Sequence, residues 1–298
     1  MWGDTGPPRQ GEIVETELTF KVIKEDVDSG FGSNSTVSEI ESHSFFQPKS
    51  ETEYSAKPEE PQHQATMKDV PNFTTLVDSK MYTRNHYTVG IICALPKELM
   101  AVRALFDNRH SNLSTIAGDS NQYALGDMEG HWVVATCLPD GEYGTNSAAS
   151  VASNLKCSFS TIRFCLLVGI GGGVPSEKKD IRLGDVVVSL PTGTSPGVLQ
   201  YDLGKEENGD HFRLIGNRVV KDVKFRNRLA REHNILCFEM EAAGVINTVD
   251  CLVIRGICDY CDAQKNDVWQ AYAAAAAAAY AKLLLGVVAK VEYDRNVT

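Results

Sequence analysis

The amino-acid sequence predicts an α/β sandwich built on a mixed β-sheet. Three observations predict it, and all of them lie after residue 85. Short segments rich in Val, Ile and Leu alternate with segments whose apolar residues recur at helical spacing. Two neighbouring apolar segments are separated by Glu129 and Gly130, which is typical of a β-hairpin turn. Strands that alternate with helices indicate an α/β sandwich, and the hairpin among them indicates a mixed sheet.

The first elements follow one another closely. "YTVGIICAL", at 87–95, is predicted to be a buried strand because it is apolar and β-branched. "PKELMAVRALF", at 96–106, is predicted to be a helix with Pro96 in its first turn. The hairpin is expected over 122–137. The apolar face of the helix consists of Leu99, Val102, Leu105 and Phe106.

The remaining elements continue the alternation of strands and helices. The expected order is a helix capped by Thr145 or Asn146, strands at 163–170 and 184–190, a charged surface helix at 224–233, a strand at 235–240, a helix start at 241–247, a strand at 251–257 and a closing helix at 269–288.

Three regions are expected along the chain. Residues 1–85 are rich in Ser, Glu, Pro, Gln and Thr and carry few sustained apolar patterns. Such a composition cannot bury enough apolar surface to fold, so this region is predicted to be a disordered N-terminal tail. The α/β domain is expected over residues 86–290, followed by a C-terminal tail over 291–298.

Composition excludes several classes of function. The formal net charge is -10 and the pI is about 5.2, whereas binding to nucleic acid needs a basic face. A membrane span is not expected, because residues 1–25 lack the apolar core of a signal and the apolar stretch 271–289 is mostly alanine and contains Lys282.

The eight cysteines do not have the spacing of a disulfide framework. Most of them lie in or beside apolar, strand-like segments, which is typical of buried thiols in a reducing compartment. We therefore expect a cytoplasmic protein. Cys258 and Cys261 form a CxxC pair, but no second pair stands at zinc spacing, so no metal site is expected.

Polar residues and glycines follow four of the expected strands. Ligands in open α/β folds bind beyond the carboxyl ends of the strands. Glu98 follows the first strand, Glu239 and Glu241 stand at the end of the apolar segment 235–238, and Asp259 follows the last strand. A cluster of glycines, whose backbone N–H groups could approach an anion, follows the strand that begins at 163: Gly169, Gly171, Gly172 and Gly173.

Each acid has a chemical role open to it and an ordinary alternative. A carboxylate can take a proton from water, and a protonated Asp can donate to a leaving nitrogen when burial or a neighbouring carboxylate raises its pKa. A carboxylate can also accept two hydrogen bonds from a sugar diol. The alternative is a solvated surface acid, which suits Glu98 at a helix start. For the glycine cluster the alternative is a tight turn after a buried strand.

Five motifs occur in an order that resembles a known family. The set resembles the nucleoside phosphorylase/nucleosidase superfamily over residues 87–289 and is similar to its fungal branch, near the methylthioadenosine/S-adenosylhomocysteine nucleosidases. The resemblance implies a three-layer α/β/α sandwich with a central mixed sheet. In that branch the domain often precedes NACHT, ankyrin or TPR regions in immune-receptor-like proteins. The motifs are "VGIICALPKEL", "VGIGGGVP", "IRLGDVVVS", "CFEMEAAG" and "VIRGICDY".

The resemblance implies a role for each matching residue. Glu98 would orient or activate the attacking water, Asp259 would protonate purine N7 as the glycosidic bond breaks, and Glu241 would bind the ribose hydroxyls. The partner would be a small purine nucleoside, with no cofactor, and the family's usual assembly implies a homo-oligomer. The other implied substrate contacts are Met240 under the sugar, Arg255 beside it, Val219 and Val220 along the base, and Gly171 in the ribose wall.

Two positions beside the glycine cluster separate hydrolysis from phosphorolysis. Phosphorylases of this superfamily place an arginine before the cluster and a hydroxyl residue within it, and the matching positions here are Leu167 and Ile170. Without that cation a phosphate nucleophile is poorly held, which favours water. The leading hypothesis is a purine nucleosidase. The alternatives are a catalytically weak or inactive signalling module of a fungal receptor-like system and, third, a purine nucleoside phosphorylase.

One segment of the family pattern has no counterpart in this chain. In the family, the stretch after "QYDLGK" continues through a helix and a strand before "SGN", whereas here "HFRLIGNRVVKD" joins the two parts directly. The gap lies near residues 211–217, so the sandwich is expected to lack one strand and one helix. The lost strand leaves an open edge unless "FRLIG" takes its place, and activity is in doubt for that reason.

Overall fold

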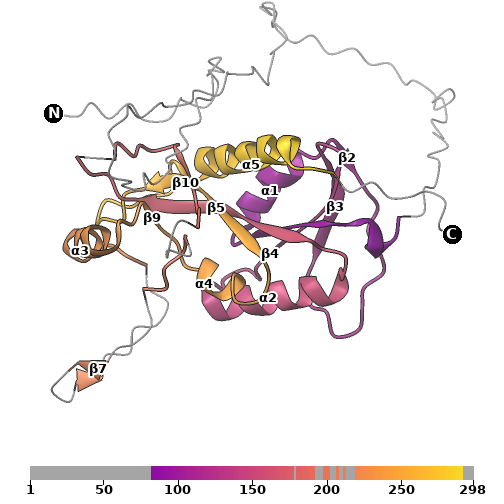
Figure 1. Ribbon diagram of the computed structural model, residues 1–298, viewed down its shortest axis with the longest axis horizontal. Coiled ribbons are helices and arrows are strands. Elements are labelled where there is room, and N and C mark those ends of the chain that lie inside the picture. Colours follow the sequence, from indigo (N-terminus) through magenta and orange to yellow (C-terminus); the bar gives the residue numbers. More distant parts are fainter. Residues whose placement is uncertain are drawn as a thin grey trace, which may run out of the picture.

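Figure 1 shows the computed structural model as a central sheet with helices on both faces. The structure describes residues 82–177, 179–191, 197–201 and 219–290, together with the backbone of 206–207 and 211–212. The three-layer α/β/α sandwich expected from the sequence is confirmed. The predicted C-terminal tail, and all but the last residues of the predicted N-terminal tail, lie outside the described residues.

The main sheet is mixed, as predicted. Its strands lie in the order β2-β3-β4-β1-β5-β10-β6, and β9 pairs with the far end of β5. Strands β4, β1, β5 and β10 are parallel, whereas β3 and β6 run antiparallel to their neighbours. The strands are β1 (Val89–Cys93), β2 (Asn108–Arg109), β3 (Tyr123–Met128), β4 (His131–Cys137), β5 (Phe164–Gly173), β6 (Val186–Val188), β9 (Cys237–Phe238) and β10 (Cys251–Asp259).

The helices form the two outer layers. Helices α1 and α5 pack on one face of the sheet, α2 and α4 pack on the other, and α3 lies near β9 (Figure 1). A short 3-10 turn at Arg84–His86 precedes β1. The helices are α1 (Pro96–Ala104), α2 (Thr145–Ser158), α3 (Val223–His233), α4 (Ala242–Val245) and α5 (Gln270–Val287).

Alternation along β5 supplies both hydrophobic cores. Successive side chains of a strand point to opposite faces of the sheet. Leu166 and Val168 therefore pack in the core beneath α1 and α5, whereas Cys165 and Leu167 pack in the core beneath α2 and α4. All four side chains are buried, so this strand is apolar on both faces, as expected for a central parallel strand.

Close packing of β10 against α5 makes a direct test of the fold. A Cβ at Gly256 would lie 1.9 Å from the backbone oxygen of Ala273, a contact that only a backbone shift can relieve. We expect Gly256→Ala to lower the free energy of unfolding by at least about 2 kcal/mol. Gly286→Ala in α5 is the control, because a Cβ at Gly286 would meet nothing closer than 3.7 Å.

The control should be neutral or stabilise the protein by up to about 1 kcal/mol, since alanine is the better helix former. Urea unfolding followed by circular dichroism measures both changes. Equal stability of the two variants would contradict the packing of α5 on β10.

Elements that were predicted from short sequence patterns are confirmed. The hairpin turns at Glu129 and Gly130, both with positive φ (52° and 76°). The closing helix and the charged helix lie where they were expected. The expectation that the glycine cluster follows the strand is wrong, because β5 continues as a strand through Gly173. The long register of β5 with β10, which ends at Gly172, holds the glycines in the sheet.

The region of the expected gap is only partly described. Strands β7 (Glu206–Glu207) and β8 (His211–Phe212) form a separate two-stranded sheet. The expected return of "FRLIG" to the main sheet falls on residues 212–216, of which only residue 212 is described, and that residue pairs with Glu206 instead. Among the described residues β6 is the last strand of the main sheet on this side.

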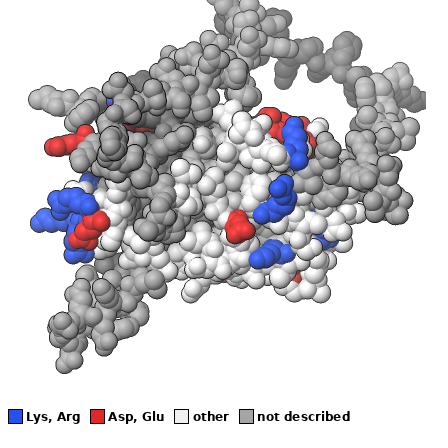
Figure 2. All heavy atoms as spheres, viewed as in Figure 1, with Lys and Arg blue, Asp and Glu red and all other residues white. Residues whose placement is uncertain are grey.

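Three further sequence expectations concern the surface and the thiols. In the described part of the chain, no helix combines the length and apolarity needed to cross a membrane. All eight cysteines are free. On the face in Figure 2, basic and acidic side chains are interspersed, and no broad basic surface is visible among the described residues.

Candidate active site

Glu98 is buried at the start of α1. Pro96 begins this helix, and the carboxylate of Glu98 turns back so that its Oε2 accepts hydrogen bonds from the N–H groups of Ala94 (2.7 Å) and Leu95 (2.8 Å). Its side chain reaches across the sheet, where Oε1 accepts from the Ile170 N–H (2.8 Å). The residue is 1% exposed, so it is not the solvated helix-start acid of the ordinary alternative.

The glycine cluster therefore holds an anion that belongs to the chain itself. The Ile170 N–H on β5 binds Glu98. Burial raises the pKa of Glu98, and this effect outweighs the lowering by Arg255 and by the three N–H donors. A carboxylate with a raised pKa is a stronger base toward a bound water.

Gly169 makes room for two charged groups. A Cβ at this position would lie 2.3 Å from Arg255 Nη1 and 2.5 Å from Glu98 Oε1. Both side chains thus pack against the Gly169 Cα, and any larger residue here would displace them. The sequence placed Gly169 in the cluster without assigning it this purpose.

Arg255 is the buried cation of the site. It lies on β10 and is 2% exposed, and its Nη2 is 2.6 Å from Glu239 Oε2 and 3.5 Å from Glu241 Oε2. Burial alone would lower the pKa of Arg255, but Glu239, Glu241 and Glu98 together raise it above its usual value. Its Nε and Nη1 have no hydrogen-bond partner among the described residues.

Glu239 and Glu241 approach Arg255 from the turn before α4. Glu239 Oε2 also accepts from the N–H groups of Glu241 (3.0 Å) and Ala242 (2.8 Å). Glu241 Oε1 accepts from the Gly144 N–H at 3.3 Å. Burial raises the pKa of Glu241, and the nearby Glu239 and Glu98 raise it further against the opposing effect of Arg255.

Asp259 ends β10 in a setting that differs from the expectation. Its Oδ1 accepts from the Cys261 N–H (2.8 Å), and its Oδ2 lies 2.9 Å from Lys265 Nζ and 3.3 Å from Cys258 Sγ. Burial raises the pKa of Asp259, but these donors outweigh burial and bring the pKa below its usual value. The condition under which an aspartic acid would hold its proton, a pKa raised by burial or by a second carboxylate, is therefore not met here, because the Cys261 N–H and Lys265 act against burial.

The two valines predicted to line the base lie in different surroundings. Val220 is buried and packs with Val174, Phe238 and Cys261. Val219 is 49% exposed. Gly171, predicted in the ribose wall, is buried against β9, where a Cβ would lie 2.4 Å from Cys237 Sγ. Met240 is half-buried between the two glutamates of its motif.

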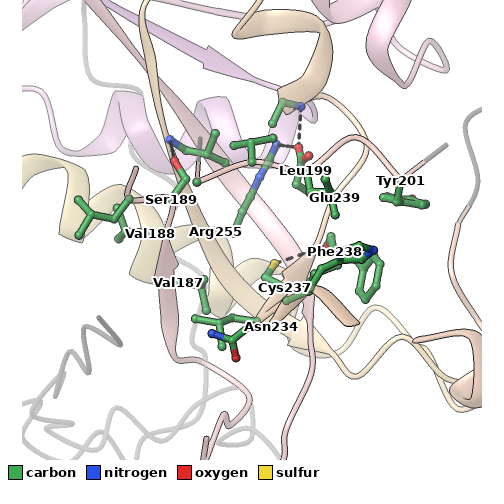
Figure 3. A pocket seen from close by; sticks show the side chains of 18 residues that line it. Val187, Val188, Ser189, Leu199, Tyr201, Asn234, Cys237, Phe238, Glu239 and Arg255 are labelled. Carbon is green, nitrogen blue, oxygen red and sulfur yellow. Dashed lines mark hydrogen bonds and ion pairs between the residues drawn. The ribbon is translucent and has the colours of Figure 1, made fainter. Parts of the chain in front are cut away.

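A cavity of about 150 Å³ adjoins this cluster and shares two residues with it. Figure 3 shows Arg255 and Glu239, joined by their ion pair, on the wall of the cavity. Glu98, Glu241 and Asp259 do not line it. Its other walls come mainly from β6, from residues 197–201 and from residues 233–238, and include Val187, Ser189, Leu199, Tyr201, Leu236 and Phe238.

The structure thus brings Glu98, Glu241 and Arg255 together, whereas Asp259 lies further along β10, at its carboxyl end, with Cys261 and Lys265. Sequence reasoning missed Lys265, the positioning role of Glu239 and the edge-to-face pair of Tyr201 and Phe238. For Glu239 the spacing to Glu241 was a signal, whereas no local pattern marks Lys265. Among the described residues, no group of three or more His, Cys, Asp or Glu side chains is arranged to hold a metal ion.

The fold of this chain is shared with solved nucleosidases. The chain is similar to the solved futalosine hydrolase of Helicobacter pylori (18% identity, TM-score 0.52). The match covers 69% of this chain and 99% of the hydrolase. The chain is equally similar to the Helicobacter pylori methylthioadenosine/S-adenosylhomocysteine nucleosidase solved with an inhibitor (17% identity, TM-score 0.52, 68% and 100% covered). No protein-family model matches the chain.

Two sequence relatives are similar over parts of their length. A nucleotide-binding leucine-rich repeat (NLR)-like protein of Hyaloscypha variabilis is 37% identical over 292 residues, which include 68% of this chain and 29% of the relative. A methylthioadenosine/S-adenosylhomocysteine nucleosidase of Mycobacterium bovis is 30% identical over 119 residues, 39% of each chain. This chain therefore spans well under half the length of either relative.

Proposed function

We propose that this domain hydrolyses the N-glycosidic bond of purine nucleosides with water as the nucleophile. The observation that carries the proposal is the burial of Glu98 near Arg255, whose Nη1 has no hydrogen-bond partner among the described residues. A water bound between the two groups can donate to the carboxylate and accept from the guanidinium N–H. The similarity in fold to two nucleosidases supports the same reaction.

Each remaining group has a part in the proposed reaction. Glu241 accepts hydrogen bonds from the ribose hydroxyls, and Met240 lies beneath the sugar. The bond from ribose C1′ to the base nitrogen breaks, and its electron pair goes to the purine. Asp259 delivers a proton to purine N7 while Glu98 takes a proton from the attacking water. Val220 and Phe238 supply the apolar surface for the base, and Gly171 and Val219 complete the wall around the substrate.

The surroundings of Leu167 and Ile170 favour water over phosphate. Leu167 is buried in the core beneath α2 and cannot reach a ligand, and the Ile170 N–H is already bound to Glu98. Arg255, the buried cation, is paired with two glutamates. A phosphate dianion would be repelled by these carboxylates, and the buried cation nearby is already ion-paired with them.

A nucleoside panel tests the proposal. The full chain is incubated with adenosine, inosine, methylthioadenosine and ATP, with and without phosphate, and products are separated by chromatography. We expect free base and free sugar at equal rates in both buffers. Base release that requires phosphate would establish a phosphorylase instead.

A second candidate is a signalling or effector module with weak or no catalysis. The similarity to an NLR-like protein, of which this chain spans 29%, favours it. In that case a folded protein would release base from no substrate in the panel. For both candidates we propose a cytoplasmic protein that forms homo-oligomers, with the domain at 86–290 between two tails and with no nucleic-acid or membrane partner.

A further inference from the structure

Lys265 makes the contact with Asp259 that the proposed reaction leaves unused. Its Nζ lies 2.9 Å from Asp259 Oδ2, in the segment between β10 and α5. The lysine side chain is 30% exposed, whereas Asp259 is buried. The ammonium therefore lies at the boundary between the buried acid and the open side of the site, where a purine that reaches Asp259 also meets Lys265.

The edge of a purine that carries N7 also carries the substituent at C6. Guanine and hypoxanthine offer two acceptors along this edge, N7 and O6, whereas adenine offers an acceptor at N7 and a donor at its 6-amino group. To bind adenine at this edge, the protein must supply a donor for N7 and a free acceptor for the 6-amino group. To bind a 6-oxopurine, it must supply two donors, one for N7 and one for O6. The groups beside Asp259 therefore decide which base the site accepts.

Donors predominate around the Asp259 carboxylate. Its Oδ2 is already approached by the Lys265 ammonium and by the Cys258 thiol, and its Oδ1 accepts from the Cys261 N–H. A 6-amino group would meet an ammonium, which accepts no hydrogen bond. An O6 atom would receive one.

We propose that this site selects 6-oxopurine nucleosides, with Lys265 donating to O6 while Asp259 serves N7. The inference rests on the proposed nucleosidase function and assigns its substrate class. Such a site disfavours adenine because the 6-amino group, a donor, would face the Lys265 ammonium, which is also a donor.

The same contact couples recognition to proton transfer. While Lys265 stays on Asp259, the carboxyl is ionised and has no proton to give. When O6 draws the ammonium away, Asp259 loses that partner, its pKa rises, and it binds a proton from solvent. As the glycosidic bond breaks, its electron pair spreads over the base toward N7 and O6. The proton on Asp259 moves to N7, and Lys265 remains charged beside O6.

Kinetics with two substrates measure the selectivity. We expect kcat/KM for inosine to exceed that for adenosine by at least about tenfold in the full-length protein. Lys265→Met, which keeps the length of the side chain and removes its donors, should bring this ratio close to one, and Lys265→Arg should preserve the preference. Lys282→Met is the matched control, because Lys282 is also partly buried and ion-paired but lies with Asp107 and the Leu105 carbonyl, away from Asp259.

Two results in this experiment would overturn the inference. One is a wild-type preference for adenosine, which leaves the nucleosidase function intact. The other is an inosine-to-adenosine ratio that Lys265→Met leaves unchanged, which makes the ion pair purely structural. Thermal melting of each variant identifies any loss that comes from unfolding.

Calorimetric binding of the free bases supplies a readout that does not need catalysis. Hypoxanthine should bind more tightly than adenine, and Lys265→Met should remove the difference. If no nucleoside is hydrolysed but this pattern holds, the proposed function fails and the base selectivity stands. Binding of neither base, or of adenine in preference, would refute the selectivity.

Discussion

Asp259→Asn is expected to lower kcat for nucleoside hydrolysis by at least about 1,000-fold. The amide cannot bind the proton that the carboxyl delivers to N7, so the purine must leave as an anion. The amide oxygen can still accept from the Cys261 N–H, so the turn after β10 should keep its shape. Rates of base release at saturating substrate measure the loss.

Asp262→Asn is the matched control for this variant. Asp262 lies three residues further along the same segment, and its carboxylate accepts from the Gln264 N–H rather than facing the buried site. It should retain wild-type activity. Turnover by Asp259→Asn above a tenth of the wild-type rate would refute the assignment of Asp259 as the acid.

Glu98→Gln is expected to lower kcat/KM by about 100-fold or more, because an amide cannot take a proton from the attacking water. Some stability should also be lost, about 1–2 kcal/mol, since Gln must turn its NH₂ toward an N–H group that now binds a carboxylate oxygen. Assays well below the melting temperature separate the two effects. Glu142→Gln, an exposed residue before α2, should change neither quantity.

The role of Glu98 as a base also predicts the direction in which kcat/KM changes with pH. The base acts in its ionised form, so kcat/KM of the wild type should rise as the pH increases through the pKa of Glu98, which burial places above its usual 4.5. Glu98→Gln should remove that rise. An identical acid limb in wild type and variant would assign the titration to another group and contradict the role of Glu98.

Sequence reasoning reached the fold because its signals are local. The Glu129–Gly130 pair between two apolar segments predicted the hairpin, and both residues adopt positive φ in the turn. One long alanine-rich pattern predicted the ends of α5. The carboxylates were found by their position after strands, a rule that holds for any open α/β sheet. For this reason Glu98, Glu241 and Asp259 could be named in advance.

What the sequence could not supply depends on contacts between distant segments. Glu98 binds a backbone group that is 72 residues away, and nothing around either residue announces the pair. Lys265 lies in a polar segment that resembles an ordinary loop, yet together with the Cys261 N–H it lowers the pKa of Asp259. The glycines were expected after the strand and not within it. Their place in β5 depends on pairing with β10 and β9, which the sequence of one segment does not reveal.

The cavity beside Arg255 belongs to the same class of long-range feature. It is enclosed by segments from before and after the expected gap, namely residues 187–190, 197–201 and 233–239, together with β10. The sequence indicated that a strand and a helix were missing but not how the remaining segments would enclose the space beside β6.

The central claim is that water attacks the sugar carbon, and labelled water tests it most directly. The full chain is incubated with inosine and phosphate in water enriched in heavy oxygen, and the released sugar is analysed by mass spectrometry immediately after turnover. Heavy oxygen should be found on C1 of free ribose, at a rate that phosphate does not change. Ribose 1-phosphate with no label on C1 would contradict the account.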